Sequence, residues 1–227
     1  MPHRRRGAEP AMPNVYMYVV ARDFGFAPNP FHSVCTLATC KPMIRRKAQV
    51  GDWVIGMGGA KLDAVGRCIY LMQVTDTLTF DAYWNDPEYH CKRPVRNGSR
   101  VTIMGDNIYH RPVGTTAWVQ EDSHHSQIDG RPEPSNIKND TQTDRVLLSR
   151  NFFHFGDAAP AIPEEILTQL KYNNGRGHRI YTVAQAQPLL DWIHAAYKGR
   201  VNTVTGDPYQ FMKSSSRYSK RMDKIVE

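Results

Sequence analysis

The sequence predicts an α+β fold, with a strongly bent, mostly antiparallel sheet or a small β-barrel and flanking helices. Strand-like runs rich in β-branched and aromatic residues are concentrated in the first half of the chain. Helical patterns are clearest toward the C-terminus, and a Gly51-Asp52 turn leads directly into an apolar strand-like run. With 227 residues, of which 41% are hydrophobic and 22% charged, the chain suits one globular domain with short appendages.

The domain boundaries follow from composition. Residues 1–13 combine arginines and prolines without apolar periodicity, so we expect a flexible basic arm. Residues 14–200 are expected to form a single domain, and residues 201–227 a basic C-terminal tail that frays from Ser214. No run approaches the roughly 18 apolar residues of a membrane helix, and no apolar signal segment follows the first arginines. We therefore expect a cytoplasmic protein with no membrane partner.

The first elements are two extended segments and a short helix. Residues 15–21 are rich in valine and tyrosine and predict a largely buried strand. Residues 34–39 predict a second strand or extended segment. Pro42 suits the first position of a short helix that runs through Ala48.

The middle of the chain alternates apolar runs with turns. Residues 53–59 predict a strand, and residues 66–75 its antiparallel partner across a long connection. Residues 78–84 lead into an Asn-Asp-Pro turn, and residues 101–104 predict a further strand. Residues 120–144 form a long polar segment, which is typical of a functional or a disordered loop.

The C-terminal third returns to core-like character. Residues 146–148 and 152–155 are apolar. A helix is expected to start with Pro163 at its first position and to close at residues 173–175, because two glutamates favour its N-terminus.

A last helix is indicated by apolar residues at helical spacing up to Tyr197. Thr182 and Gln185 have the spacing of a capping box at its start. Because Pro188 would clash with a preceding helical turn, a start at Gln187 is the alternative.

The charge of the chain favours a polyanionic ligand. Its formal net charge is +7, and much of the excess is clustered, which is the expected footprint of phosphate contacts. The clusters are residues 4–6, residues 45–47, residues 92–100 and residues 213–224. A solvated basic surface is the alternative interpretation.

The loop at residues 24–31 is stiff and rich in aromatic and proline residues. Pro28 and Pro30 fix the backbone on either side of Asn29, so its amide would lose little freedom on binding. An amide carries donors and an acceptor and suits the edge of a base. The alternative is a packed loop that covers one end of the core.

A pocket for a base needs an aromatic surface, an edge-reading amide and a cation for phosphate. The aromatic candidates are Trp53, Tyr83, Trp84 and Tyr109, the amides are Asn29 and Asn107, and the cations are Lys41, Arg45 and Arg46. For the aromatic residues, burial in the core is the alternative. The Asp106-Asn107 pair could equally form only a turn.

Acid–base chemistry has its own candidates. Asp106 and Asp144 could form an acid–base pair or a magnesium site if they converge, with His125 as a further general acid or base. Carboxylates that cap loops and pair with arginines are the alternative. Other loop carboxylates and histidines with the same potential are Asp23, Asp140, His154 and His178.

The four cysteines lack a CxxC pair, and we expect them to be reduced. Cys40 beside Lys41 could be a nucleophile, whereas an inert buried thiol is the alternative. The spacing of Cys35, Cys40, His32 and Cys91 does not match known structural zinc sites, so no metal site is predicted. No cofactor follows from the sequence.

Several blocks, taken together, resemble a known family. They are residues 18–31, 35–42, 51–56, 83–84, 105–109 and 144–148, with the match running from about Tyr16 to His178. They resemble the bacterial and phage family called nucleotide modification associated domain, second type. The resemblance implies an association with enzymes that modify nucleotides or sense modified ones. The Gly-Asp-Trp-Val entry is more distantly similar to the PUA-like group that includes EVE and ASCH domains, which implies a small β-barrel whose mouth receives a base.

The sequence therefore predicts a domain that binds a nucleotide or a modified base in nucleic acid, in a DNA-modification or phage-defence pathway. One alternative is an enzyme that acts on a nucleotide with Asp106, Asp144 and a histidine. The other is an interaction subunit that docks a nucleotide-modifying enzyme through its basic arm or tail.

Overall fold

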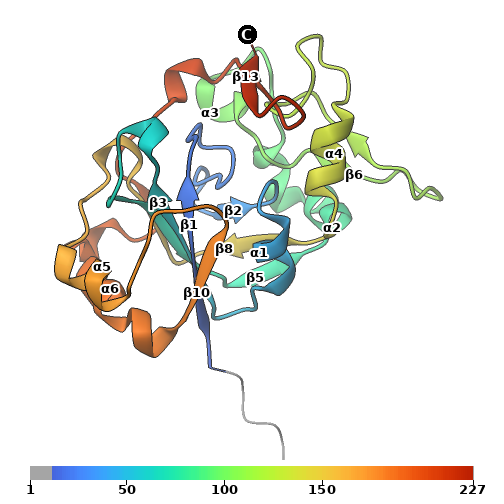
Figure 1. Cartoon of the computed structure of the whole chain (residues 1–227). Coiled ribbons are helices and arrows are strands. Elements are labelled where there is room, and N and C mark those ends of the chain that lie inside the picture. The colour runs from blue at the N-terminus through green and yellow to red at the C-terminus, as the bar shows by residue number, and fades with distance from the viewer. Residues whose placement is uncertain (1–11, 227) are drawn as a thin grey trace, which may run out of the picture.

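The computed structural model describes residues 12–226, and a mixed six-stranded sheet forms its centre (Figure 1). In spatial order the strands are β10 (His178–Thr182), β1 (Asn14–Val20), β3 (Trp53–Gly58), β4 (Cys68–Gln73), β9 (Phe152–His154) and β11 (Thr203–Val204). β1 pairs in parallel with β3 and antiparallel with β10, whereas the pairs from β3 to β4 and from β4 to β9 are antiparallel.

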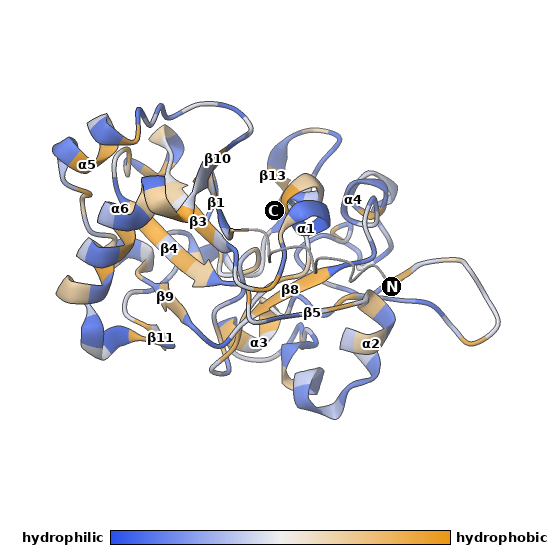
Figure 2. Cartoon of the chain, turned by 90° about the horizontal axis from the view of Figure 1, so that it is seen from below, coloured by the Kyte–Doolittle hydropathy of each residue, from blue (hydrophilic) through white to orange (hydrophobic). Residues whose placement is uncertain are grey.

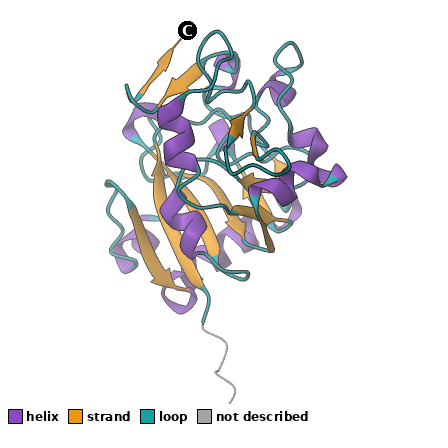
Figure 3. Cartoon of the chain, turned by 90° about the vertical axis from the view of Figure 1, so that its right-hand side faces the viewer, coloured by secondary structure: helices purple, strands orange, loops and turns teal. Residues whose placement is uncertain are grey.

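The α+β prediction is confirmed, but the small PUA-like barrel is not. β10 and β11 are the two edges of the six-stranded sheet and do not pair with each other, so the described residues form no closed barrel. The open sheet carries few helices, which leaves most of the connections as loops and short turns (Figure 3).

A second, three-stranded sheet lies beside the first. It is antiparallel, in the order β2 (Cys35–Leu37), β8 (Val146–Ser149) and β5 (Asp76–Leu78). Two small hairpins complete the strands, β6 (Tyr109–His110) with β7 (Val119–Gln120), and β12 (Arg217–Ser219) with β13 (Lys224–Val226).

The helices are short except for the last. They are α1 (Pro42–Lys47), α2 (Phe80–Asn85), α3 (Arg100–Ile103), α4 (Pro134–Asp140), α5 (Glu164–Gln169) and α6 (Val183–Ala196). The predicted capping box of Thr182 and Gln185 at the start of α6 is confirmed, with Pro188 tolerated inside the helix.

Two apolar clusters make up the core. The first is built on the six-stranded sheet, whose strands β3, β4 and β9 are strongly hydrophobic, and α6 packs against it (Figure 2). The second surrounds the three-stranded sheet and includes Phe24, Phe26 and Phe31 of the predicted stiff loop. The buried residues of β1 belong to the first cluster, and the loop after β1 carries Phe24 and Phe26 of the second, so the two clusters meet near the C-terminal end of this strand.

Three sequence predictions need correction. Residues 101–104 were expected as a strand but belong largely to α3, because the Ser99 side chain accepts from the Thr102 N–H at 3.3 Å and starts a helical turn. Pro163 is the residue before α5 rather than its first residue, and α5 ends at Gln169, ahead of Lys171, whose backbone is left-handed. The polar segment 120–144 is not a disordered loop, because it contains Gln120 of β7 and all of α4.

The expected C-terminal tail contributes ordered elements. Residues 201–226 contain β11, a short helical turn and the β12–β13 hairpin, which lies at the top of the molecule in Figure 1. The backbone N–H of Tyr218 donates to the carbonyl of His124 at 2.7 Å, which anchors the hairpin to the polar segment. Residues 1–11 of the predicted basic arm lie outside the described residues.

Candidate functional site

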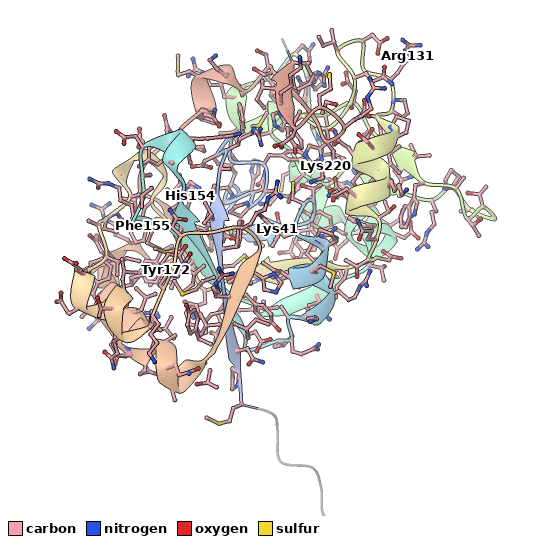
Figure 4. The ribbon with its side chains drawn as sticks, viewed as in Figure 1. Lys41, Arg131, His154, Phe155, Tyr172 and Lys220 are labelled. Carbon is pink, nitrogen blue, oxygen red and sulfur yellow. The ribbon has the colours of Figure 1, made fainter. Side chains whose placement is uncertain are left out.

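A cavity of about 400 Å³ opens at the junction of the two apolar clusters. Its walls come from the C-terminal end of β1, the turn before α1, the segment 124–139 and the β12–β13 hairpin. The cationic side chains of its lining are Arg22, Lys41, Lys61 and Lys220, and the carboxylate is Asp223. Lys41 and Lys220 both line the cavity, and both are labelled near the centre of the view in Figure 4.

Aromatic rings and amides form the rest of the wall. Phe24 and Phe26 lie at 4.5 Å and 5.3 Å, centroid to centroid, from the His124 ring. The Asn136 amide donates to the carbonyls of His125 at 2.7 Å and Tyr218 at 2.6 Å, so α4 ties the polar segment to the hairpin. The lining therefore offers cations, flat rings and amides in one place.

Three side chains on this wall form a connected series. The Cys40 sulfur lies 3.8 Å from Nε2 of His125. On the other side of the imidazole ring, Nδ1 lies 2.7 Å from an Asp140 carboxylate oxygen. His125 and Asp140 are buried, whereas Cys40 is partly exposed and faces the cavity.

Asp140 is held from several directions. One carboxylate oxygen accepts from the Cys40 N–H at 2.8 Å and the Asn139 amide at 2.9 Å. The other accepts from the Tyr109 hydroxyl at 3.0 Å as well as from His125. The buried guanidinium of Arg45 donates to the Asp140 carbonyl and to the Cys40 carbonyl, the latter at 2.8 Å.

This environment shifts the pKa values of the two adjacent histidines in opposite directions. Burial lowers the pKa of His125, but the charges of Asp140 and Cys40 outweigh it and raise the pKa to about 10. Burial and the neighbouring His125 lower the pKa of His124 to about 3. Burial raises the pKa of Asp140, but His125 and Arg45 outweigh it and leave the pKa lowered. At neutral pH, His125 is therefore an imidazolium and His124 is neutral.

The donor atoms of the same three side chains lie within 4.8 Å of one another, close enough to surround a metal ion. One imidazole can direct only one nitrogen at an ion, and the Asp140 carboxylate lies against the other nitrogen. An ion between Cys40 and His125 would thus have Asp140 on the far side of the ring. The arrangement fits a nucleophile, base and carboxylate better than a three-ligand metal centre.

Two predicted site residues line the cavity, and two lie directly behind it. Lys41 and His125 are on the wall, and the Lys41 amine lies 4.2 Å above the Tyr18 ring. Tyr109 and Arg45 instead hold Asp140 in place. The Tyr109 hydroxyl donates to the Asp140 carboxylate, and the Arg45 guanidinium donates to backbone carbonyls around it. Neither of these two faces the cavity.

Asn29, Asp106 and Asn107 belong to a separate buried network. The Lys92 amine donates to the Asn29 amide oxygen at 2.7 Å, and burial lowers the pKa of this amine to about 8. Asp106 accepts from the Tyr83 hydroxyl at 2.8 Å, and the Asn107 amide donates to the Tyr83 carbonyl at 2.8 Å. Within the described chain these groups tie the stiff loop to its neighbours and do not line the cavity.

The remaining predicted residues lie elsewhere. Asp144 accepts from the Phe80 N–H at 2.7 Å and from the Arg111 guanidinium at 2.6 Å, and shares no hydrogen-bond partner with Asp106. Trp84 stacks on His110 at 4.2 Å between ring centroids. Arg46 is exposed and donates to the Gln142 carbonyl at 2.5 Å. The roles predicted for these residues remain predictions.

Sequence reasoning missed most of the wall. Tyr218, Lys220 and Asp223 lie in the segment that was expected to be a tail, where only the basic character of residues 213–224 was predicted to matter. Arg22, just before the stiff loop, was not predicted as a site residue. Asp140 was one of several loop carboxylates, with nothing to connect it to His125. The signal that was available is the pair Cys40 and Lys41, directly ahead of a proline-initiated helix.

An α+β protein with a basic, ring-lined cavity is the class that this fold and site define. The chain belongs to the family described as nucleotide modification associated domain 2, whose model matches residues 12–215. No curated protein and no solved structure gives a significant match. Within residues 12–226, no helix combines the length and apolar character needed to cross a membrane.

Proposed function

We propose that the cavity binds a nucleotide, either free or as a modified base of a nucleic acid. The observation that carries the proposal is the lining, where Arg22 pairs with the carboxylate of Asp223 and three lysines, Lys41, Lys61 and Lys220, remain beside aromatic rings. Cations bind phosphate, and rings bind the flat face of a base. Family membership, which associates the chain with nucleotide modification, supports the same ligand class.

The size and position of the cavity support this assignment. A volume of about 400 Å³ falls in the range of small-molecule sites, about 300–1,000 Å³. Burial, opposed by Cys40 and reinforced by Lys220, lowers the pKa of the Lys41 amine. An anion between Lys41 and Lys220 would reduce the repulsion between them, so a bound phosphate should be favoured there.

The setting that we propose is a DNA-modification or phage-defence pathway, in which a nucleotide-modifying enzyme is the expected partner. The nearest test concerns the ligand. Isothermal titration calorimetry should show at least about tenfold tighter binding of deoxynucleoside monophosphates than of the same nucleosides, with affinity falling as salt rises. Equal affinity for nucleoside and monophosphate would contradict a phosphate site.

A matched pair of variants tests the wall. Lys220 and Lys224 are both exposed and both belong to the C-terminal hairpin region, but only Lys220 lines the cavity. We expect Lys220→Glu to weaken monophosphate binding at least about tenfold and Lys224→Glu to leave it within about twofold. If the two variants behave alike, general surface charge and not the cavity holds the ligand.

A further inference from the structure

The Cys40 thiol is presented at a sharp turn between β2 and α1. Cys40 and Lys41 have φ values of 56° and 37°, so two successive non-glycine residues adopt the left-handed conformation. Such backbone is unfavourable and is concentrated at active sites, where the surrounding structure enforces it. Hydrolases present a nucleophile on a comparable strand-to-helix turn. Here the Asp140 carboxylate accepts from the Cys40 N–H at 2.8 Å and fixes the turn.

His125 connects the thiol to the carboxylate in the order that nucleophilic catalysis needs. Its Nε2 faces the Cys40 sulfur at 3.8 Å, and its Nδ1 faces Asp140 at 2.7 Å. The ring is fixed by packing, since it lies 4.7 Å from the Phe26 ring and 5.6 Å from the Tyr218 ring between centroids. A nucleophile, a base and a group that orients the base are recognised by this geometry on unrelated folds.

The four cysteines differ in burial and in the groups that they contact. Burial raises the pKa of the Cys35 thiol to about 12 and raises that of Cys68. Cys91 is exposed, and its sulfur contacts the Glu88 carbonyl at 3.5 Å. Cys40 alone among the four contacts a histidine and lines the cavity. The titratable or charged groups around the Cys40–His125 pair are Asp140, Arg45, Tyr109, Tyr18, Lys41, His124 and Tyr218.

We propose that Cys40 and His125 catalyse the transfer of an acyl group from a nucleotide that carries it as an amide or ester, with Asp140 as a positioning residue. The nucleotide part of this substrate rests on the proposed function, and the acyl chemistry rests on the Cys40, His125 and Asp140 geometry. An imidazolium beside a thiol stabilises the thiolate and also holds the proton that a leaving group needs.

The reaction is balanced without an oxidant or reductant. The Cys40 thiolate forms a sulfur–carbon bond to the acyl carbon, and the carbon–nitrogen or carbon–oxygen bond to the nucleotide breaks. The proton on Nε2 of His125 goes to the departing nitrogen or oxygen. Water then attacks the thioester and gives a proton to His125, and the carbon–sulfur bond breaks. The products are the free acid and the deacylated nucleotide, with the thiolate and imidazolium restored.

The first test uses the unaltered protein, so it does not depend on a variant that folds. Iodoacetamide is added at about pH 6, where an ordinary thiol is ionised to well under about 1%. The four cysteines are then followed by peptide mass spectrometry. We expect the partly exposed Cys40 to be alkylated at least about tenfold faster than the fully accessible Cys91. Equal or slower alkylation of Cys40 would overturn the assignment.

A second test looks for the acyl intermediate. With 4-nitrophenyl acetate, we expect a burst of nitrophenol and one acetyl group on Cys40 in the wild type and in Cys91→Ser. Cys40→Ala should give neither, and an acetyl group found only on other residues would overturn the proposal. In Asp140→Asn, the rate advantage of Cys40 over Cys91 in alkylation should fall more at about pH 6 than at about pH 9, a change that loss of packing alone would not produce.

Deoxynucleoside monophosphates separate this inference from the proposed function. If they slow Cys40 alkylation but not Cys91 alkylation, both proposals are supported. Fast alkylation of Cys40 that no monophosphate slows would keep the reactive cysteine and overturn the nucleotide as substrate. Protection of a Cys40 that reacts no faster than Cys91 would keep the nucleotide site and overturn the acyl chemistry.

Discussion

At the scale of single residues, Arg45 is the cation on which the candidate site depends structurally. Its side chain is fully buried, and it donates to the carbonyls of Cys40, Asp140, Thr143 and Arg145. These bonds join the turn that carries the thiol to the segment that carries the carboxylate. Arg45 therefore sets the distance between the two ends of the Cys40, His125 and Asp140 series.

Replacing Arg45 should be costly. Arg45→Met would leave several buried carbonyls without a donor and would remove one of the two cations beside Asp140, so we expect a loss of about 3 kcal/mol or more in unfolding free energy. Arg46→Met is the matched control, because Arg46 is the next residue along the helix but is exposed, so its replacement should change stability by no more than about 0.5 kcal/mol. Urea denaturation measures both. Similar losses for the two variants would show that burial of Arg45 is not decisive.

His125 should make stability depend on pH. Its pKa is raised to about 10 in the folded protein, above the roughly 6.5 of an unfolded histidine. The stabilisation is therefore fully present below about pH 6.5 and is lost as pH rises toward about 10. The lowered pKa of Asp140 makes stability depend on pH in the acidic range. The stabilisation from the ionised Asp140 is present above the ordinary pKa of an aspartate and is lost as pH falls through the lowered pKa.

The test compares unfolding free energies of wild type and His125→Asn from about pH 6 to about pH 10. We expect the stability difference between them to shrink as pH rises through this window. His90→Asn, at an exposed position, controls for the substitution itself. A difference that stays constant or grows with pH would mean that His125 is not held as an imidazolium.

At the scale of elements, the N-terminus of α6 shows how local sequence fixes structure. The Thr182 hydroxyl accepts from the Gln185 N–H at 3.2 Å, and the Gln185 side chain accepts from the Thr182 N–H at 2.9 Å. The helix packs Ala186, Leu189 and Ile193 into the first apolar cluster. A capped start thus outweighs the presence of Pro188, which explains why the helix begins at Val183 rather than near Gln187.

Removing this cap should weaken the helix. Thr182→Ala is expected to cost about 1 kcal/mol of unfolding free energy, since the Gln185 N–H loses the hydroxyl that accepts its hydrogen bond. The same substitution at Thr168, which is exposed on α5, should be neutral within about 0.5 kcal/mol. Thermal or urea unfolding distinguishes them. An equal loss at both positions would assign the effect to composition rather than capping.

At the scale of the whole molecule, the sequence predicted the fold class better than the site. β1, β3, β4 and α6 follow from local patterns, because buried strands and capped helices leave a strong period in the sequence. The cavity does not follow from local patterns, since its wall brings together Cys40, His125 and Lys220, which are far apart in the sequence. Asp106 and Asn29 attracted attention as loop residues with suitable groups, but their polarity serves a buried network.

Because the cavity lies where both apolar clusters and the C-terminal hairpin meet, a ligand there should stabilise the molecule as a unit. A deoxynucleoside monophosphate at about 100 times its dissociation constant should add about 2.7 kcal/mol to the unfolding free energy. At the same ligand concentration, a tenfold weaker Lys220→Glu should lose about half of this gain, and Lys224→Glu should keep nearly all of it. Urea unfolding monitored by tryptophan fluorescence and by circular dichroism should shift together. A shift in one signal alone would mean that the ligand stabilises only part of the protein, and no shift at saturation would contradict binding to the folded state.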